Sequence, residues 1–172
     1  ESCRGIGHSF GYNQMEGPTQ YLTVKDLVHS FVDIVSKNGN LLLNVGPKAD
    51  GSLPEIQEKR LRALGEWLDR NGQAIFKSRP WIRAQGKTDK GIDVRFTQRE
   101  GRMFAIVLGA IESGTVTILT VKLEKDATVY LLGREKLKLD WEQSEIGFSF
   151  HLPDASSLDT PAYSVEISKL PI

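Results

Sequence analysis

The chain has 172 residues, 40% of them hydrophobic and 26% charged, a composition typical of a folded globular protein and unlike that of disordered, collagen-like or coiled-coil chains. Its 22 basic and 22 acidic residues cancel, so it lacks the positive charge that binding to nucleic acid or to an anionic membrane requires. No apolar run reaches the roughly 18 residues that a membrane-spanning helix needs.

The chain offers few residues for disulfides or metal sites. The single cysteine, Cys3, excludes a disulfide within the chain and a cysteine-rich metal site. The histidines His8, His29 and His151 are scattered without a metal-ligand spacing, so we expect no metal and no other cofactor. The chain begins at Glu1 without a methionine or a charged-then-apolar leader, and we expect it to be a segment of a longer chain.

Two helices and one strand are predicted in the first half. Thr23 followed by Asp26 is a capping-box pattern, apolar residues then recur at helical spacing, and residues 38–39 (Asn-Gly) supply a stop. Residues 41–45 form a short continuous apolar run, typical of a parallel strand buried on both faces. Residues 54–72 predict a second helix, with proline in its first turn and Asn-Gly at its end. This order is a piece of a βα repeat, which needs further strands to complete its sheet.

From about residue 81 the pattern changes to strands. Apolar and polar residues alternate in six short segments that glycine-containing turns separate, as in antiparallel sheets. No helical period competes with this pattern, so we expect a β-sandwich in the second half. The six segments are residues 92–96, 103–108, 115–119, 128–132, 148–152 and 163–167.

Glu16 and Arg4 are the first candidates for chemistry. Glu16 lies in a loop of aromatic, amide and glycine residues, where a carboxyl group could have a raised pKa and act as a general acid; the alternative is a solvated loop glutamate. Arg4 could hydrogen-bond the hydroxyl groups or a carboxylate of a ligand, or form a structural ion pair. Cys3 is expected to be a small buried residue rather than a nucleophile.

The three tryptophans have different expected roles. Trp67 falls at helical spacing and is predicted to lie in the core. Trp81 is expected to pack where the two halves meet. Trp141 stands between acidic residues, and both packing and ligand binding stay open for it.

Several motifs together resemble the retaining α-L-fucosidases. Order and spacing agree over about the first 81 residues, and the block SKNGNLLLNVGP is the most specific part. The second half is similar to the C-terminal β-sandwich of that family by position and pattern. The matching segments are residues 3–7 (CRGIG), 10–13 (FGYN), 35–47 (VSKNGNLLLNVGP), 50–51 (DG), 65–68 (GEWL), 71–76 (NGQAIF) and 79–81 (RPW).

The resemblance implies an α/β plus all-β fold. Residues 1–80 would be the C-terminal end of a (β/α)8-like catalytic barrel, and residues 81–172 an antiparallel β-sandwich domain. The implied reaction is hydrolysis of terminal α-L-fucosyl residues with retention, through a covalent fucosyl-enzyme on an aspartate. A second carboxyl group protonates the leaving oxygen and then activates water.

The resemblance also implies roles for individual residues. Glu16 falls at the acid/base position and Arg4 at a fucose-contacting arginine. Leu41 lies where other members carry an aromatic ring near the sugar, and here the residue is aliphatic. Asp33 and Asp50 lack the sequence context of the nucleophile, so we expect that residue upstream of the chain and expect these 172 residues alone to be inactive.

The expected partners are a fucosylated oligosaccharide or glycoside and the missing N-terminal part of the barrel, with self-association left open. A competing hypothesis is a non-catalytic carbohydrate-binding or interaction module that retains a remnant of the barrel. Residues that precede Glu1 would discriminate the two, because only the enzyme needs an upstream Trp-x-Asp strand and paired histidines.

Overall fold

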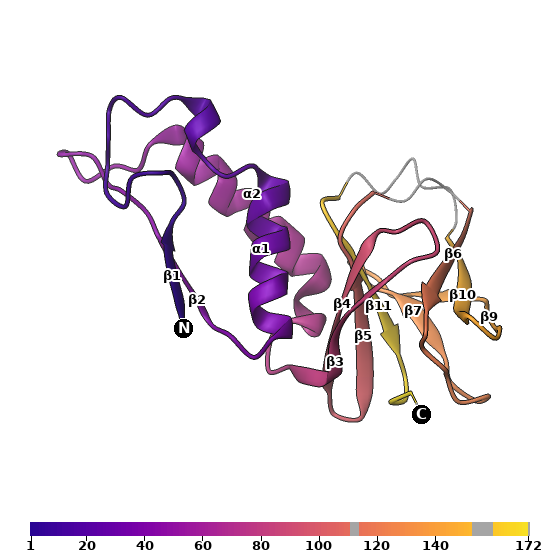
Figure 1. Ribbon diagram of the computed structural model, residues 1–172. Coiled ribbons are helices and arrows are strands. Elements are labelled where there is room, and N and C mark those ends of the chain that lie inside the picture. Colours follow the sequence, from indigo (N-terminus) through magenta and orange to yellow (C-terminus); the bar gives the residue numbers. More distant parts are fainter. Residues whose placement is uncertain (111–113, 153–159, 172) are drawn as a thin grey trace.

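A computed structural model describes residues 1–110, 114–152 and 160–171. In Figure 1, two helices lie between a short pair of strands, which carries the N-terminus, and a set of antiparallel sheets. Within the described residues, no helix is long and apolar enough to cross a membrane.

The first two strands form a parallel pair. Strand β1 (Ser2–Gly5) lies beside β2 (Leu41–Asn44), which confirms the parallel strand expected there. The prediction that this strand is buried on both faces is wrong, because the side chain of Leu42 is 55% exposed. One face of the pair packs on the helices through Leu43 and Val45, whereas no described segment covers the face that carries Leu42.

Helix α1 (Val24–Ser36) begins and ends where the sequence predicts. The Thr23 hydroxyl accepts a hydrogen bond from the backbone N–H of Asp26 (3.0 Å), which satisfies one of the free amides of the first turn. At the other end Asn38 takes a left-handed conformation (φ 68°), and Gly39 N–H donates to a carbonyl of the last helical turn.

Helix α2 (Glu55–Asn71) confirms the second predicted helix. Pro54 is its N-cap, one position before the helical turn in which we expected it. The helix ends at Asn71 with Gly72 as its C-cap, and the 3-10 helix η2 (Gly72–Ala74) continues the chain toward the sheets. Another 3-10 helix, η1 (Pro18–Gln20), precedes α1.

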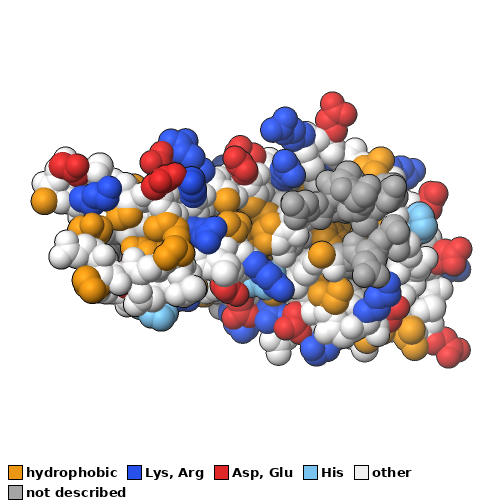
Figure 2. Space-filling model, turned by 90° about the horizontal axis from the view of Figure 1, so that it is seen from above, with side chains coloured by type: hydrophobic (Ala, Val, Ile, Leu, Met, Phe, Trp, Pro, Cys, Tyr) orange, Lys and Arg blue, Asp and Glu red, His pale blue; other side chains and the backbone are white. Residues whose placement is uncertain are grey.

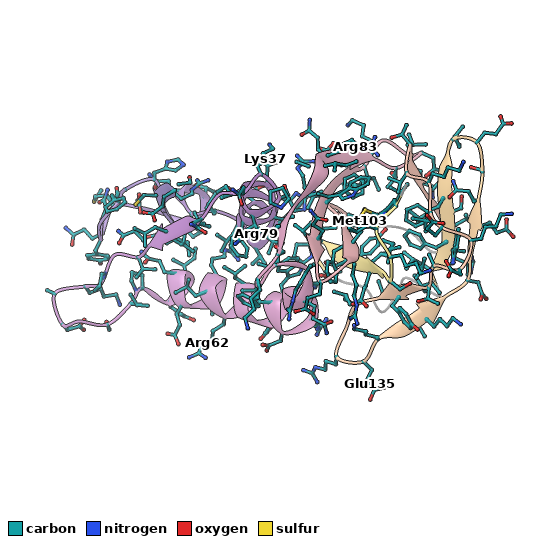
Figure 3. The ribbon with its side chains drawn as sticks, turned by 90° about the horizontal axis from the view of Figure 1, so that it is seen from below. Lys37, Arg62, Arg79, Arg83, Met103 and Glu135 are labelled. Atoms are coloured by element: carbon teal, nitrogen blue, oxygen red, sulfur yellow. The ribbon has the colours of Figure 1, made fainter. Side chains whose placement is uncertain are left out.

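The second half forms two antiparallel sheets that enclose a common core, which confirms the sandwich-like arrangement. The larger sheet has the order β3-β4-β5-β11-β7-β8 and the smaller one β6-β10-β9. Inward side chains of both sheets, among them Phe96, Met103, Phe148 and Phe150, form one buried cluster. Figure 3 shows Met103 amid the side chains between the sheets and Arg62 on the outer side of α2. The strands are β3 (Arg79–Lys87), β4 (Asp93–Arg99), β5 (Arg102–Val107), β6 (Gly114–Leu119), β7 (Val129–Leu131), β8 (Leu137–Leu139), β9 (Trp141–Gln143), β10 (Gly147–Leu152) and β11 (Tyr163–Ile167).

Three of these strands, β3, β8 and β9, were not predicted. Strand β3 carries Pro80 and has an irregular register between Pro80 and Gln85, which breaks the alternation of apolar and polar residues. Proline is tolerated there because β3 lies at the edge of its sheet. Strands β8 and β9 have three residues each, too few to establish a period.

The helices pack directly against the larger sheet. The indole Nε1 of Trp67 donates to the carbonyl of Ala162 (2.8 Å), and Trp67 is only 3% exposed, so its predicted place in the core is confirmed. Arg95 on β4 donates through Nε to the carboxylate of Asp33 on α1 (2.6 Å). A buried apolar cluster spans the junction and contains Val28, Val32, Trp67, Ala74, Ile75, Phe104, Ile106, Leu132 and Ala162.

Candidate functional site

Glu16 lies in the loop that follows β1, at the carboxyl end of the parallel strand pair. One of its carboxylate oxygens accepts a hydrogen bond from the backbone N–H of Ser9. This bond is the main reason why the pKa of Glu16 is lowered from its usual range, and the Ser9 and Tyr21 hydroxyls and the nearby His8 add to the effect. The structure therefore corrects the expectation of a raised pKa: the hydrogen bonds to the ionised carboxylate outweigh its desolvation.

The space for this carboxylate depends on a glycine. A Cβ atom on Gly7 would lie 2.7 Å from Oε2 of Glu16 and 2.9 Å from the ring of Tyr21. Gly7 also forms an isolated antiparallel bridge with Tyr21, whose side chain is buried. The absence of a side chain at this position thus leaves room for Glu16 between the loop and the Tyr21 ring.

Arg4 lies on β1, immediately before the loop that carries Glu16. It is opposite Leu43, and its Nε is buried and has no hydrogen-bond partner among the described residues. The sequence left open a structural ion pair as the alternative role of Arg4. Its side chain forms no ion pair within the described residues. A ligand could therefore be bound only through the terminal nitrogens of its guanidinium group, since the buried Nε is out of reach.

Leu41 lies at the other end of the strand pair. It is opposite Ser2, at the amino end of β2, whereas Glu16 follows the carboxyl end of β1. Leu41 instead lines a hollow with Phe31 and Val35 of α1 and with Phe76. The structure thus places Arg4 and Glu16 toward the carboxyl end of the strand pair and leaves Leu41 at its amino end.

Asn44 and Gly46 belong to the site, although the sequence analysis did not single them out. Asn44 ends β2, and its Nδ2 donates to the carbonyl of Phe10 in the Glu16 loop. A Cβ atom on Gly46 would lie 2.3 Å from the backbone nitrogen of Tyr12, so the two loops are in direct backbone contact. Their place after a parallel strand is the signal that could have identified them, because such loops build the sites of α/β folds.

The Glu16 loop exposes large apolar side chains. Phe10, Tyr12 and Met15 are 58%, 43% and 80% exposed. In Figure 2, hydrophobic side chains gather at the end of the molecule that carries the strand pair and its loops. A carboxylate, a guanidinium group and an apolar rim at one end of the molecule can together bind and protonate a ligand with both hydroxyl groups and an apolar face.

The remaining polar candidates have other surroundings. Cys3 is exposed, which corrects the expectation of a buried residue: its side chain is on the same uncovered face as Leu42, the residue opposite. The ring of His29 forms a hydrogen bond with the carbonyl of Pro161 (2.8 Å). Among the described residues, no group of three or more His, Cys, Asp or Glu side chains could hold a metal ion.

A second hollow lies on the smaller sheet, far along the chain from Glu16. Its volume is about 230 Å³, and it contains two carboxylates, an imidazole and two hydroxyl groups. Nε1 of Trp141 donates to the carbonyl of Ala127 (3.0 Å), so this tryptophan also supports the core of the sandwich. The residues that line the hollow are Thr115, Asp140, Trp141, Glu142, Ser149, Phe150 and His151.

The sequence has clear relatives. Residues 1–73 match the family model for alpha-L-fucosidase. An alpha-L-fucosidase of Branchiostoma floridae is 37% identical over 163 residues, covering 94% of this chain and 36% of the relative. The human plasma alpha-L-fucosidase is 37% identical over 166 residues, covering 94% of this chain and 35% of the relative. The chain thus spans about a third of the length of these relatives.

Solved structures give the same relationship. The alpha-fucosidase of Thermotoga maritima in complex with a mechanism-based inhibitor superimposes with a TM-score of 0.89 and 39% identity, covering 97% of this chain and 39% of that one. The same enzyme in complex with fucose gives a TM-score of 0.88 and 40% identity, with 96% and 39% covered. Sequence and fold agree along almost the whole chain, and it therefore belongs to the alpha-L-fucosidase family, where it corresponds to the C-terminal part of its relatives.

Proposed function

We propose that the protein that carries this chain hydrolyses terminal α-L-fucosyl residues of glycans or glycosides, with retention of configuration at the anomeric carbon. The observation that carries the proposal is the carboxylate of Glu16, held by the Ser9 amide at the carboxyl end of a parallel strand pair. The relatives named alpha-L-fucosidase and the Thermotoga maritima enzyme in complex with fucose support the choice of substrate.

In this proposal the chain contributes two parts. Residues 1–80 are the C-terminal end of a (β/α)8-like catalytic domain, and residues 81–172 are a β-sandwich domain. The parallel β1–β2 pair with its two helices supports the first assignment, since alternating helices and parallel strands build such barrels. The change to antiparallel pairing at β3 supports the boundary.

Glu16 acts as the acid/base residue of a double displacement. An aspartate outside these residues attacks the anomeric carbon, and the protonated Glu16 transfers its proton to the leaving oxygen as the glycosidic bond breaks. In the second step the Glu16 carboxylate takes a proton from water, which hydrolyses the fucosyl-enzyme. The lowered pKa of Glu16 suits this second step, because that step needs the ionised carboxylate. The first step needs the protonated acid, so the pKa must rise when bound substrate displaces water from the carboxylate.

Arg4 binds the sugar in this proposal. Its side chain has no ion pair within the described chain, which supports a hydrogen bond from its terminal nitrogens to a hydroxyl group of the substrate. The geometry gives less support to a contact between Leu41 and the sugar, because Leu41 lies at the opposite end of the strand pair.

The experiment is the replacement of Glu16 in the protein that carries this chain. We expect Glu16→Ala to lower kcat/KM by about 100- to 10,000-fold on a fucoside with a poor leaving group. On a fucoside with a good leaving group, azide should restore turnover by attacking the fucosyl-enzyme without a general base, which gives an azido-fucose product. NMR of the fucose first formed by the wild type should show the α-anomer. Full activity of Glu16→Ala, or β-fucose as the first product, would refute the assigned mechanism.

The hollow beside Trp141 favours a second candidate function, non-catalytic saccharide binding by the sandwich. Carboxylates and hydroxyl groups accept and donate the hydrogen bonds that sugar hydroxyls make. Isothermal titration with fucosylated oligosaccharides, on wild-type protein and on Glu142→Ala, distinguishes the two. Binding that Glu142→Ala removes, without any hydrolysis, would establish the module in place of the enzyme.

A further inference from the structure

Gln57 is a buried polar residue that binds the backbone of the loop after β2. It lies in the first turn of α2, is only 2% exposed, and accepts through Oε1 a hydrogen bond from the backbone N–H of Gly46 (2.9 Å). A buried amide side chain is costly unless its polar atoms are paired, and so is a buried backbone N–H. The bond therefore fixes the loop after β2 to the start of α2.

The loop that Gln57 holds is the support of the Glu16 loop. At Gly46 the backbones of the two loops are so close that a Cβ atom would lie 2.3 Å from the nitrogen of Tyr12 and 2.5 Å from the carbonyl carbon of Gly11. The neighbouring Asn44 also donates to the Glu16 loop, at the carbonyl of Phe10. A displacement of Gly46 must therefore displace residues 10–12.

Short-range hydrogen bonds transmit that position to Glu16. Asn13 donates through Nδ2 to the hydroxyl of Ser9 (3.0 Å), and its carbonyl accepts the backbone N–H of Glu16 (3.1 Å). Ser9 in turn donates its backbone N–H to the Glu16 carboxylate. These hydrogen bonds close the segment from Ser9 to Glu16 into a loop. The loop therefore moves as one unit when Gly46, against which its backbone lies, is displaced.

We propose that Gln57 is a positioning residue, which sets the location of the Glu16 carboxylate through Gly46 and the backbone of Tyr12. The inference rests on the proposed acid/base role of Glu16. Gln57 is only 2% exposed and therefore does not contact the substrate itself. It acts by holding the acid at the leaving oxygen. A shift of about 1 Å in a catalytic group can lower a rate by about 100-fold.

The test compares two substrates in the protein that carries this chain. Cleavage of methyl α-L-fucoside needs protonation of a poor leaving group, whereas α-L-fucosyl fluoride needs little help from an acid. We expect Gln57→Met, of similar length but without the acceptor, to lower kcat/KM at least about tenfold more on the methyl fucoside than on the fluoride. Gln57→Glu keeps an acceptor oxygen, and its ratio between the two substrates should stay near that of the wild type.

Asn71→Leu is the matched control. Asn71 is a buried amide at the far end of the same helix, 3% exposed, whose Nδ2 donates to the carbonyl of Trp67 (3.1 Å) and not to the Glu16 loop. Its replacement should lower stability without altering the ratio between the substrates. Because that ratio does not depend on how much enzyme is folded, partial unfolding of any variant cannot imitate the expected result.

The outcomes distinguish a failure of the positioning role of Gln57 from a failure of the acid/base role of Glu16. An unchanged ratio in Gln57→Met, or an equal change in Asn71→Leu, overturns the positioning role of Gln57 while Glu16→Ala still disables the enzyme. If Glu16→Ala itself leaves the ratio unchanged, the acid/base role fails first, and the role of Gln57 fails with it.

Discussion

Replacing Gly7 with alanine would place a methyl group between the candidate acid and the buried ring of Tyr21. The new Cβ would lie 2.7 Å from Oε2 of Glu16, whereas an ordinary contact begins near 3.4 Å, so the carboxylate must withdraw by about 0.7 Å. The Tyr21 ring on the other side is 7% exposed and has little room to move. The flexible Glu16 side chain will therefore move first and lose its alignment with the Ser9 amide.

The size of the effect follows from that displacement. If a shift of 1 Å costs about 100-fold, one of about 0.7 Å should lower kcat by roughly 10- to 100-fold, or about 1.4–2.7 kcal/mol of transition-state stabilisation. The assay is the rate of methyl α-L-fucoside hydrolysis by the protein that carries this chain. The thermal unfolding midpoint, measured in parallel, should fall somewhat because the methyl group also lies 2.9 Å from the buried Tyr21 ring, so kcat is expressed per folded enzyme.

Gly11→Ala is the control for this experiment. Gly11 lies in the same loop, but a Cβ atom there would meet no atom within 4 Å. We expect this variant to keep nearly wild-type kcat. Equal losses in the two variants, or no loss in Gly7→Ala, would refute the reasoning, because the rate would then not depend on the room left for Glu16.

Two further predictions concern acidity and stability. The Tyr21 hydroxyl helps to lower the pKa of Glu16, after the larger effect of the backbone hydrogen bond already described. Tyr21→Phe should therefore raise the pKa of Glu16. Because the first step needs the protonated acid, the decline of kcat/KM with rising pH should move to higher pH. Tyr12→Phe, on the exposed part of the loop, should leave the pH profile unchanged. Thr23→Ala removes the N-cap of α1 and should lower the free energy of unfolding by about 1 kcal/mol in urea denaturation, whereas Thr19→Ala, at an exposed position without a cap, should change it little.

Local signals in the sequence predicted the helices and most strands well. The cap at Thr23 and the stop at Asn38 are contacts between residues a few positions apart, so their residue types are sufficient to identify them. Six alternating segments likewise predicted strands of the two sheets. Such patterns depend on the period of the backbone and not on distant partners.

The missed features depend on contacts that no local pattern encodes. Strand β1 has no apolar alternation and exists through its pairing with β2, about forty residues later in the chain. The partner of Glu16 is a backbone N–H, which every non-proline residue offers, so the sequence could suggest the carboxylate but not the direction of its pKa change. The exposure of Cys3 and Leu42 depends on which segments cover the strand pair, and burial patterns within a strand do not reveal this.

The apolar cluster between the helices and the larger sheet has a consequence for protein engineering. Residue 80 divides the chain into two proposed domains, yet Trp67 of α2 and Phe104 and Ile106 of β5 share one buried cluster. A sandwich grafted onto another catalytic domain would leave Phe104 and Ile106 in water unless the new host supplied a helix in place of α2. Chimaeras built from this chain should therefore exchange α1, α2 and the sheets as a single block.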